Sequence, residues 1–281
     1  MKISIIGTGM IATEVIKMLR NEAKGIEITS IFSHSNKEKA LTLAKENDID
    51  HVYTDYAQLL KEDDADFVYI ALVNNAHYTY VRQALEAQRN VIVEKPFTST
   101  LEEAKLLAQM ARERGLYLFE AVTPLHTPNF QLVKQSLKRI APIHFAQCNF
   151  SQYSSRYERY LQGDIAPAFN PELGGGALND LNVYNINIIV GLFGEPIANQ
   201  YFANHGHNGV DTSGIMVLTY PNLTASCVAA KDSSSPSFTL IQGEKGWVRI
   251  PTTANEFGKV EIMEQGKLTS YQRNAYESRL A

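Results

Sequence analysis

The sequence predicts an α/β protein in which a doubly wound parallel sheet is followed by an α+β domain with an open, mostly antiparallel sheet. Two observations lead to this prediction. In residues 1–122, short runs rich in Ile, Val and aromatic residues alternate with amphipathic stretches, which is typical of parallel strands joined by helical crossovers. After Pro128, strand-like runs follow one another with few helices between them, which favours an antiparallel sheet.

Strands and helices alternate in the first part of the chain. Apolar residues recur at helical spacing between Ile11 and Leu19, directly after the first strand. The spacings Ser35-x-x-Glu38 and Thr100-x-x-Glu103 predict capping boxes that begin two further helices. The predicted strands are Lys2–Ile6, Glu27–Phe32, Asp66–Ala71, Asn90–Val93 and Tyr117–Glu120.

The second part of the chain is predicted to be mainly β-structure. One helix is expected at Phe130–Arg139 and an apolar one at Ala177–Leu192, with a polar, tyrosine-rich stretch from Tyr153 to Pro171 between them. The boundary falls near Val122–Pro128, which gives domains of residues 1–122 and 123–281. The predicted strands are Ile143–Gln152, Ile197–Ala203, Gly214–Tyr220, Leu223–Ala230, Ser237–Ile241 and Gly246–Ile250.

Composition limits the possible functions. The 281 residues include 26 Lys and Arg against 30 Asp and Glu, a net charge of −4, whereas nucleic acids and anionic membranes require a basic face. No apolar run approaches the roughly 18 residues of a membrane helix. The two cysteines fit a reducing compartment. We therefore expect a soluble, cytoplasmic protein with no nucleic-acid or membrane partner.

The first strand leads into Gly7-Thr8-Gly9-Met10-Ile11-Ala12, a G-x-G-x-x-A pattern that opens a helix. In a dinucleotide site the first glycine permits the tight turn, the second lets the backbone approach the pyrophosphate, and the small third residue keeps helix and sheet close. The helix N-terminus would then face the phosphates. The alternative is a purely structural turn.

The end of the second strand carries the evidence on cofactor choice. An NAD site usually has a carboxylate there to bind the ribose 2′-hydroxyl. This chain instead has Ser33, His34, Ser35 and Lys37, which offer hydrogen bonds and positive charge to a 2′-phosphate. We predict NADP, with NAD still possible. The alternative is that these residues only cap the next helix.

Further candidates lie where the fourth and fifth strands end, because ligands bind at the carboxyl ends of strands in such sheets. The fifth strand ends in Val93-Glu94-Lys95-Pro96, so Glu94 and Lys95 are expected beside the cofactor. Leu72, Asn74 and His77 follow the fourth strand. A surface lysine before a turn and an ordinary histidine at a helix start are the alternatives.

The apolar helix of the second domain opens with Gly174-Gly175-Gly176-Ala177-Leu178-Asn179-Asp180, and Tyr184 follows. Asp180 and Tyr184 are four residues apart, which predicts that both lie on one helical face. A carboxylate and a phenol on an apolar helix need a ligand or a partner. A mutually satisfied buried pair is the alternative. His205, His207 and Asp211 are interpreted as loop residues, and no metal is expected.

With these motifs in this order, the chain resembles the Gfo/Idh/MocA family of NAD(P)-dependent oxidoreductases over nearly its whole length. Because it has tyrosine rather than histidine at position 184, the chain resembles the branch of this family that contains dimeric dihydrodiol dehydrogenase and glucose–fructose oxidoreductase. The resemblance implies a Rossmann domain and an open-sheet domain often used for dimerisation. It also implies that Lys95 and Tyr184 serve proton transfer while Asp180 helps to hold the substrate. His126 and Asn182 depart from the family, which often has arginine and glycine there.

We therefore expect hydride transfer between a nicotinamide and a secondary alcohol, diol or sugar-like carbonyl. Tyrosine ordinarily titrates near 10, so a nearby Lys95 ammonium would favour the phenolate that a base requires. The partners expected are a polyol, sugar or carbonyl substrate and a second copy of the chain. Two alternatives remain open, a non-catalytic NADP-binding regulator and a relative that uses NAD to drive glycoside cleavage.

Overall fold

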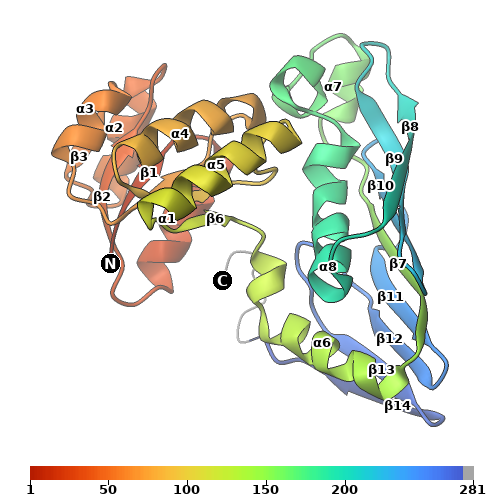
Figure 1. The fold of residues 1–281 in the computed structure, drawn as a ribbon. Coiled ribbons are helices and arrows are strands. Elements are labelled where there is room, and N and C mark those ends of the chain that lie inside the picture. The colour runs from red at the N-terminus through yellow and green to blue at the C-terminus, as the bar shows by residue number, and fades with distance from the viewer. Residues whose placement is uncertain (275–281) are drawn as a thin grey trace. The chain divides into compact units, whose positions relative to one another are not determined.

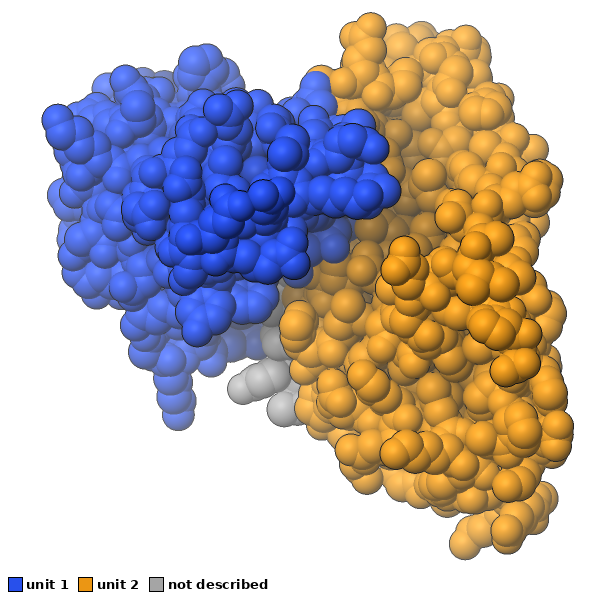
Figure 2. Space-filling view, in the orientation of Figure 1, with its two compact units in different colours: residues 1–121, 280–281 blue, residues 122–279 orange. Residues whose placement is uncertain are grey.

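A computed structural model describes residues 1–274 and divides into two compact units, which Figures 1 and 2 show. The first unit is Met1–Ala121, and the second begins at Val122. Each unit has its own sheet and its own hydrophobic core.

The first unit is a six-stranded parallel sheet with the strand order β3-β2-β1-β4-β5-β6. Apolar side chains of α3, α4 and α5 pack on one face of this sheet, and those of α1 and α2 pack on the other. The sheet is therefore doubly wound, as predicted. Its elements are β1 (Lys2–Ile6), α1 (Met10–Asn21), β2 (Glu27–Phe32), α2 (Lys37–Glu46), β3 (His51–Tyr53), α3 (Tyr56–Glu62), β4 (Phe67–Ile70), η1 (Asn74–Ala76), α4 (His77–Glu86), β5 (Asn90–Val93), α5 (Leu101–Arg114) and β6 (Leu118–Glu120).

One of the two predicted capping boxes is present. The Thr100 hydroxyl accepts the N–H of Glu103, whose carboxylate accepts the N–H of Thr100 in return. The prediction at Ser35 was wrong. Helix α2 begins at Lys37, so Asn36 occupies the N-cap position and its side chain accepts the Lys39 N–H at 2.9 Å.

The second unit is an eight-stranded sheet with the strand order β14-β13-β12-β11-β7-β10-β9-β8. It is mostly antiparallel, as predicted, although β7 and β10 pair in parallel at its centre. Its elements are η2 (Thr123–His126), α6 (Pro128–Ile140), β7 (Ile143–Ser151), α7 (Tyr157–Leu161), η3 (Pro167–Phe169), η4 (Pro171–Leu173), η5 (Leu178–Asn182), α8 (Val183–Phe193), β8 (Ala198–His205), β9 (Asp211–Thr219), β10 (Thr224–Ala230), β11 (Phe238–Gly243), β12 (Gly246–Ile250), β13 (Val260–Glu264) and β14 (Lys267–Tyr271).

Helices α6 and α8 cover one face of the eight-stranded sheet, and in the part of the chain that is described the other face carries no helix (Figure 1). Phe130 and Val133 of α6 and Ile188 and Ile189 of α8 join the sheet's inner side chains in the core of this unit. Within residues 1–274, no helix has the length and apolar character needed to cross a membrane.

The predicted helix at Ala177–Leu192 begins differently from expectation. Residues Leu178–Asn182 form a π-helical turn, η5, in which the Val183 N–H bonds to the carbonyl of Leu178, and α8 begins only at Val183. The α-helical spacing used to place Asp180 and Tyr184 on one face therefore does not hold over this turn. Such π turns occur frequently at functional sites.

Candidate active site

Two glycines shape the turn between β1 and α1. Gly7 has a φ of +123°, and a Cβ there would overlap the carbonyl oxygen of Ala71, so glycine is required. Gly9 is the N-cap of α1 and has open space where a Cβ would stand. Because Gly9 has no side chain to bond the first N–H groups of α1, the turn fits the pyrophosphate of a dinucleotide. Three more residues predicted to bind the cofactor lie beside these glycines: Thr8 stands between them, and Met10 and Ile11 begin α1.

The end of β2 presents the residues predicted to select the cofactor. His34, Ser35 and Lys37 are exposed, whereas Ser33 is buried and its hydroxyl accepts the N–H of Asn36 at 3.2 Å. Ser33 thus shapes the loop that displays the other three. No carboxylate lies between β2 and the first residue of α2, so no fixed negative charge in this loop would repel a phosphate.

His77 is fully buried and joins the loops that follow β4 and β5. Its Nδ1 lies 2.8 Å from the carbonyl oxygen of Pro96, and its Nε2 lies 3.2 Å from that of Leu72. Burial lowers the pKa of His77, the two carbonyl acceptors oppose that shift, and the charge of Lys95 adds to it. The neutral ring can donate to only one of the two carbonyls. The geometry gives His77 a role in positioning these loops, beside Asn74 at the start of η1.

Lys95, half-buried after β5, acts electrostatically on a second neighbour, the half-buried Glu120. Burial raises the pKa of Glu120 above its ordinary value, while the Phe97 N–H at 2.9 Å and the charge of Lys95 oppose that shift. The preceding residue, Glu94, is buried and accepts a 2.6 Å hydrogen bond from the Tyr69 hydroxyl. The end of β5 is therefore a structured polar site, and sequence reasoning had missed Glu120 as part of it.

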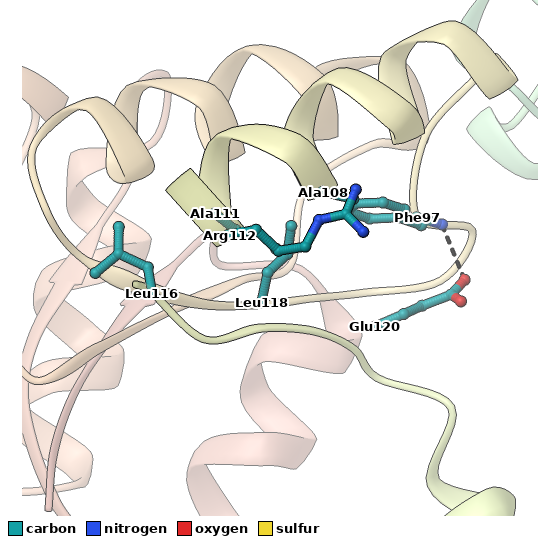
Figure 3. Close-up of a pocket in the computed structure, with 7 residues that line it drawn as sticks. All are labelled: Phe97, Ala108, Ala111, Arg112, Leu116, Leu118 and Glu120. Carbon is teal, nitrogen blue, oxygen red and sulfur yellow. Dashed lines mark hydrogen bonds between the residues drawn. The ribbon is translucent and has the colours of Figure 1, made fainter. Parts of the chain in front are cut away.

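A cavity of about 360 Å³ lies between α5 and β6 (Figure 3). Arg112 extends from α5 toward Phe97, and the dashed line in the figure is the bond between the Phe97 N–H and Glu120. The remaining lining is apolar: Ala108, Ala111, Leu116 and Leu118. None of the residues predicted to bind the cofactor lines this cavity, so it is distinct from the glycine turn.

The glycine run before η5 permits close packing. Gly176 has a φ of +123°, and a Cβ there would overlap the Asp211 carboxylate. That carboxylate accepts the Leu178 N–H and the Tyr201 hydroxyl, each at 2.7 Å through Oδ2. Asp211 therefore anchors the start of the helix. It is the first residue of β9 and His205 is the last residue of β8, so the interpretation of these two as loop residues was wrong, whereas His207 lies between the strands. In residues 1–274, no group of three or more His, Cys, Asp or Glu side chains could hold a metal ion.

Asp180 and Tyr184 both lie in the second unit, whereas Lys95 lies in the first. Asp180 Oδ2 accepts a 2.7 Å hydrogen bond from Nζ of Lys231, a buried residue that sequence reasoning missed. Tyr184 is half-buried at the start of α8, and its ring centroid lies 6.2 Å from that of Phe150. Asn182, where relatives often have glycine, is fully buried and donates to the carbonyl of Cys227, which ties η5 to β10.

A doubly wound parallel sheet with a glycine turn at the end of β1 defines a dinucleotide-binding protein of the Rossmann class. Comparisons with known families narrow this class. The family described as "Oxidoreductase family, NAD-binding Rossmann fold" matches residues 1–122, and the "GFO/IDH/MocA C-terminal domain" matches residues 130–249.

Individual proteins agree with these matches. The uncharacterized oxidoreductase YgjR of Escherichia coli (strain K12) is 34% identical over 245 residues, which cover 87% of this chain and 74% of that protein. The scyllo-inositol 2-dehydrogenase (NADP(+)) IolU of Bacillus subtilis (strain 168) is 32% identical over 254 residues, covering 89% and 76%. The solved structure of the 3-ketoreductase KijD10 from Actinomadura kijaniata, in complex with NADP and TDP-benzene, has a TM-score of 0.84 at 26% identity and covers 100% of this chain and 86% of that one. The chain belongs to the Gfo/Idh/MocA family and is an NAD(P)-dependent oxidoreductase.

Proposed function

We propose that this protein is an NADP-preferring oxidoreductase that interconverts a secondary alcohol, such as a polyol or diol carbinol, and the corresponding carbonyl. The observation that carries the proposal is Asp180, an ion-paired carboxylate on η5 whose side chain keeps 36% of its surface exposed. A carboxylate in that state can accept a hydrogen bond from a substrate hydroxyl. This substrate class is supported by two similar proteins, the scyllo-inositol 2-dehydrogenase IolU and the 3-ketoreductase KijD10.

Three side chains of the chain are assigned roles in this proposal. The bound nicotinamide would supply or accept the hydride. Tyr184 would exchange a proton with the substrate oxygen through its phenolic Oη. Lys95 would favour the phenolate, because a positive charge close to a phenol stabilises its ionised form. Asp180 would hold the substrate hydroxyl in place for that exchange.

The preference for NADP rests on the loop after β2. His34, Ser35 and Lys37 are exposed there, and the loop has no carboxylate. Lys37 and the serine hydroxyl would bond a 2′-phosphate, although His34 adds charge only when protonated. Fluorescence titration of the purified protein with NADPH and NADH tests this preference, and tighter binding of NADH would overturn it.

Replacing Lys95 with Met and Tyr184 with Phe tests the proton-transfer roles. We expect each change to lower kcat by about 10²–10⁴-fold, the usual contribution of a positioned acid–base group, while NADPH still binds. Turnover is followed at 340 nm with a panel of cyclic polyols and ketones that includes scyllo-inositol.

Lys267→Met and Tyr220→Phe are the matched controls for these two variants, because Lys267 lies on β14 and Tyr220 lies in the core, where its hydroxyl bonds to Gly194. Unchanged kcat in Lys95→Met or Tyr184→Phe would contradict the assigned roles. If the wild type bound NADPH but turned over nothing in the panel, a regulatory function would replace the proposed one. Retained cofactor with no net absorbance change, but with glycoside cleavage, would favour the glycoside-cleaving alternative.

We also propose that the chain forms a homodimer through the helix-free face of the eight-stranded sheet. Phe202 of β8 pairs with Ile215 of β9, which pairs with Val228 of β10. These residues alternate with core residues such as Cys227, so they lie on the opposite face. Phe202 and Ile215 are 54% and 42% exposed, and contiguous exposed apolar surface of this kind marks interfaces.

The two buried free cysteines fit a cytoplasmic location.

A further inference from the structure

Lys231 is one of the largest fully buried side chains of the protein. It follows the last residue of β10, and its side chain is only 2% exposed. A buried ammonium is strongly unfavourable unless hydrogen bonds and an opposite charge compensate for its lost hydration. The contacts of Lys231 therefore indicate why a lysine stands at this position.

The Lys231 ammonium contacts Asp180, Ala168 and Phe169, which are residues of the second unit. Its Nζ donates to Oδ2 of Asp180 at 2.7 Å and to the carbonyl oxygen of Ala168 at 2.7 Å. It also lies 4.5 Å from the centroid of the Phe169 ring, within the range of a cation–π interaction. The carbonyl of Ala168 accepts the N–H of Gly176 as well, at 3.2 Å. The lysine thus links the carboxylate on η5 to the η3 segment and to the glycine run.

The two members of the ion pair differ in exposure. Asp180 retains about a third of its side-chain surface, whereas Lys231 is almost completely covered. A substrate can therefore reach the carboxylate but not the ammonium. Any effect of Lys231 on a bound substrate must act through Asp180 and through the segment that the lysine holds.

We propose that Lys231 is a positioning residue, which fixes the orientation of the Asp180 carboxylate so that its exposed part faces the substrate hydroxyl. This inference rests on the proposed function, because it deepens the role assigned there to Asp180. Without the ammonium, the carboxylate would lose this ion pair and adopt other side-chain conformations. Substrate binding would then weaken, while the dinucleotide turn in the first unit would be unaffected.

A double-mutant cycle of Lys231→Met, Asp180→Asn and the double variant tests this proposal. Methionine has a similar length without the charge. We expect Lys231→Met and Asp180→Asn each to lower kcat/KM by about 10- to 100-fold, chiefly through KM, with NADPH affinity within twofold of wild type. In the double variant we expect kcat/KM to equal that of Asp180→Asn alone, because residues acting through one another are not additive.

Lys267→Met is the control variant and should keep wild-type kcat/KM. If Lys231→Met alone does not fold, the comparison of Asp180→Asn with the double variant decides, since removing both charges leaves no uncompensated buried ion. A further tenfold loss of kcat/KM in the double variant, or wild-type kcat/KM in Lys231→Met, would overturn the proposal. A wild type without turnover would instead refute the proposed function, and with it the basis of this inference.

Discussion

At the scale of single residues, the first unit depends on His77 to connect the loops after β4 and β5. The fully buried ring lies within hydrogen-bond distance of the carbonyls of Leu72 and Pro96. Lys95, which immediately precedes Pro96, is the residue proposed to favour the phenolate of Tyr184. Positioning of Lys95 is therefore expected to depend on the neutral, buried form of His77.

This burial predicts a pH effect on stability. The pKa of His77 lies below 6.5 in the folded chain, chiefly through burial, so below about pH 6.5 the unfolded chain binds a proton that the folded chain does not. Folding stability contributed by His77 is therefore present above pH 6.5 and is lost as the pH falls. We expect the wild type to lose more thermal stability between pH 7.5 and 5.5 than the His77→Gln variant, measured by circular dichroism. Equal losses in the two proteins would contradict this expectation.

Some residue roles were not predictable because they depend on neighbours distant in the sequence. Lys231 follows a strand and belongs to no motif, and its contacts form only when η3 and η5 pack against its ammonium. The cap of α2 was misplaced by one residue because serine and asparagine are both good caps, and local sequence does not determine which of them precedes the first helical residue. The glycine turn was predictable because its function depends on adjacent residues.

At the scale of elements, the start of the second-unit helix depends on a close approach between Gly176 and Asp211. The carboxylate of Asp211 bonds the Leu178 N–H and the Tyr201 hydroxyl just where a Cβ of residue 176 would lie. η5, which carries Asp180, is thus positioned by packing against β9 as well as by its own backbone hydrogen bonds.

A Gly176→Ala variant should consequently be much less stable than the wild type. Positive φ and the overlap with Asp211 together should cost about 2–4 kcal/mol of unfolding free energy. Gly209→Ala is the matched control, because Gly209 has a φ of +83° but nothing within 4 Å of the added Cβ, so it should cost only about 1 kcal/mol. Chemical denaturation measures both values. Similar losses in the two variants would show that the overlap is relieved.

Elements with a regular apolar pattern were predictable, whereas several short or polar strands were not. β3 has three residues, His51–Tyr53, of which the first is exposed, so it gives little periodic signal. β13 and β14 were missed because each has only five residues and its apolar–polar alternation fails, at Met263 in β13 and at Ser270 in β14. These strands form because neighbouring strands offer hydrogen-bonding edges, a property of the sheet rather than of the segment.

At the scale of the whole molecule, the two sheets differ in how their faces are covered. Helices cover both faces of the parallel sheet, whereas in the described residues only one face of the eight-stranded sheet is covered. This difference was predictable from the order of elements, because crossover helices must pack on a parallel sheet while hairpin strands need none.

The helix-free face yields a prediction about assembly. Ile215→Glu would place a charge in the middle of the proposed dimer interface, and we expect it to convert the dimer to monomer in sedimentation experiments. Leu106→Glu on α5, where leucine is 55% exposed, should leave the dimer intact. A monomeric wild type, or a dimeric Ile215→Glu variant, would refute this interface.

The central position of β7 has a consequence for biosynthesis. Its two neighbouring strands in the sheet, β10 and β11, are synthesised much later. Cys148 of β7, for example, pairs with Cys227 of β10 and Thr239 of β11. While a ribosome is still translating the intervening region, both edges of β7 lack their native neighbours. The unpaired N–H and C=O groups of such edges can pair with other chains, which leads to aggregation. The nascent second domain therefore passes through a vulnerable interval that ends only when β10 and β11 emerge.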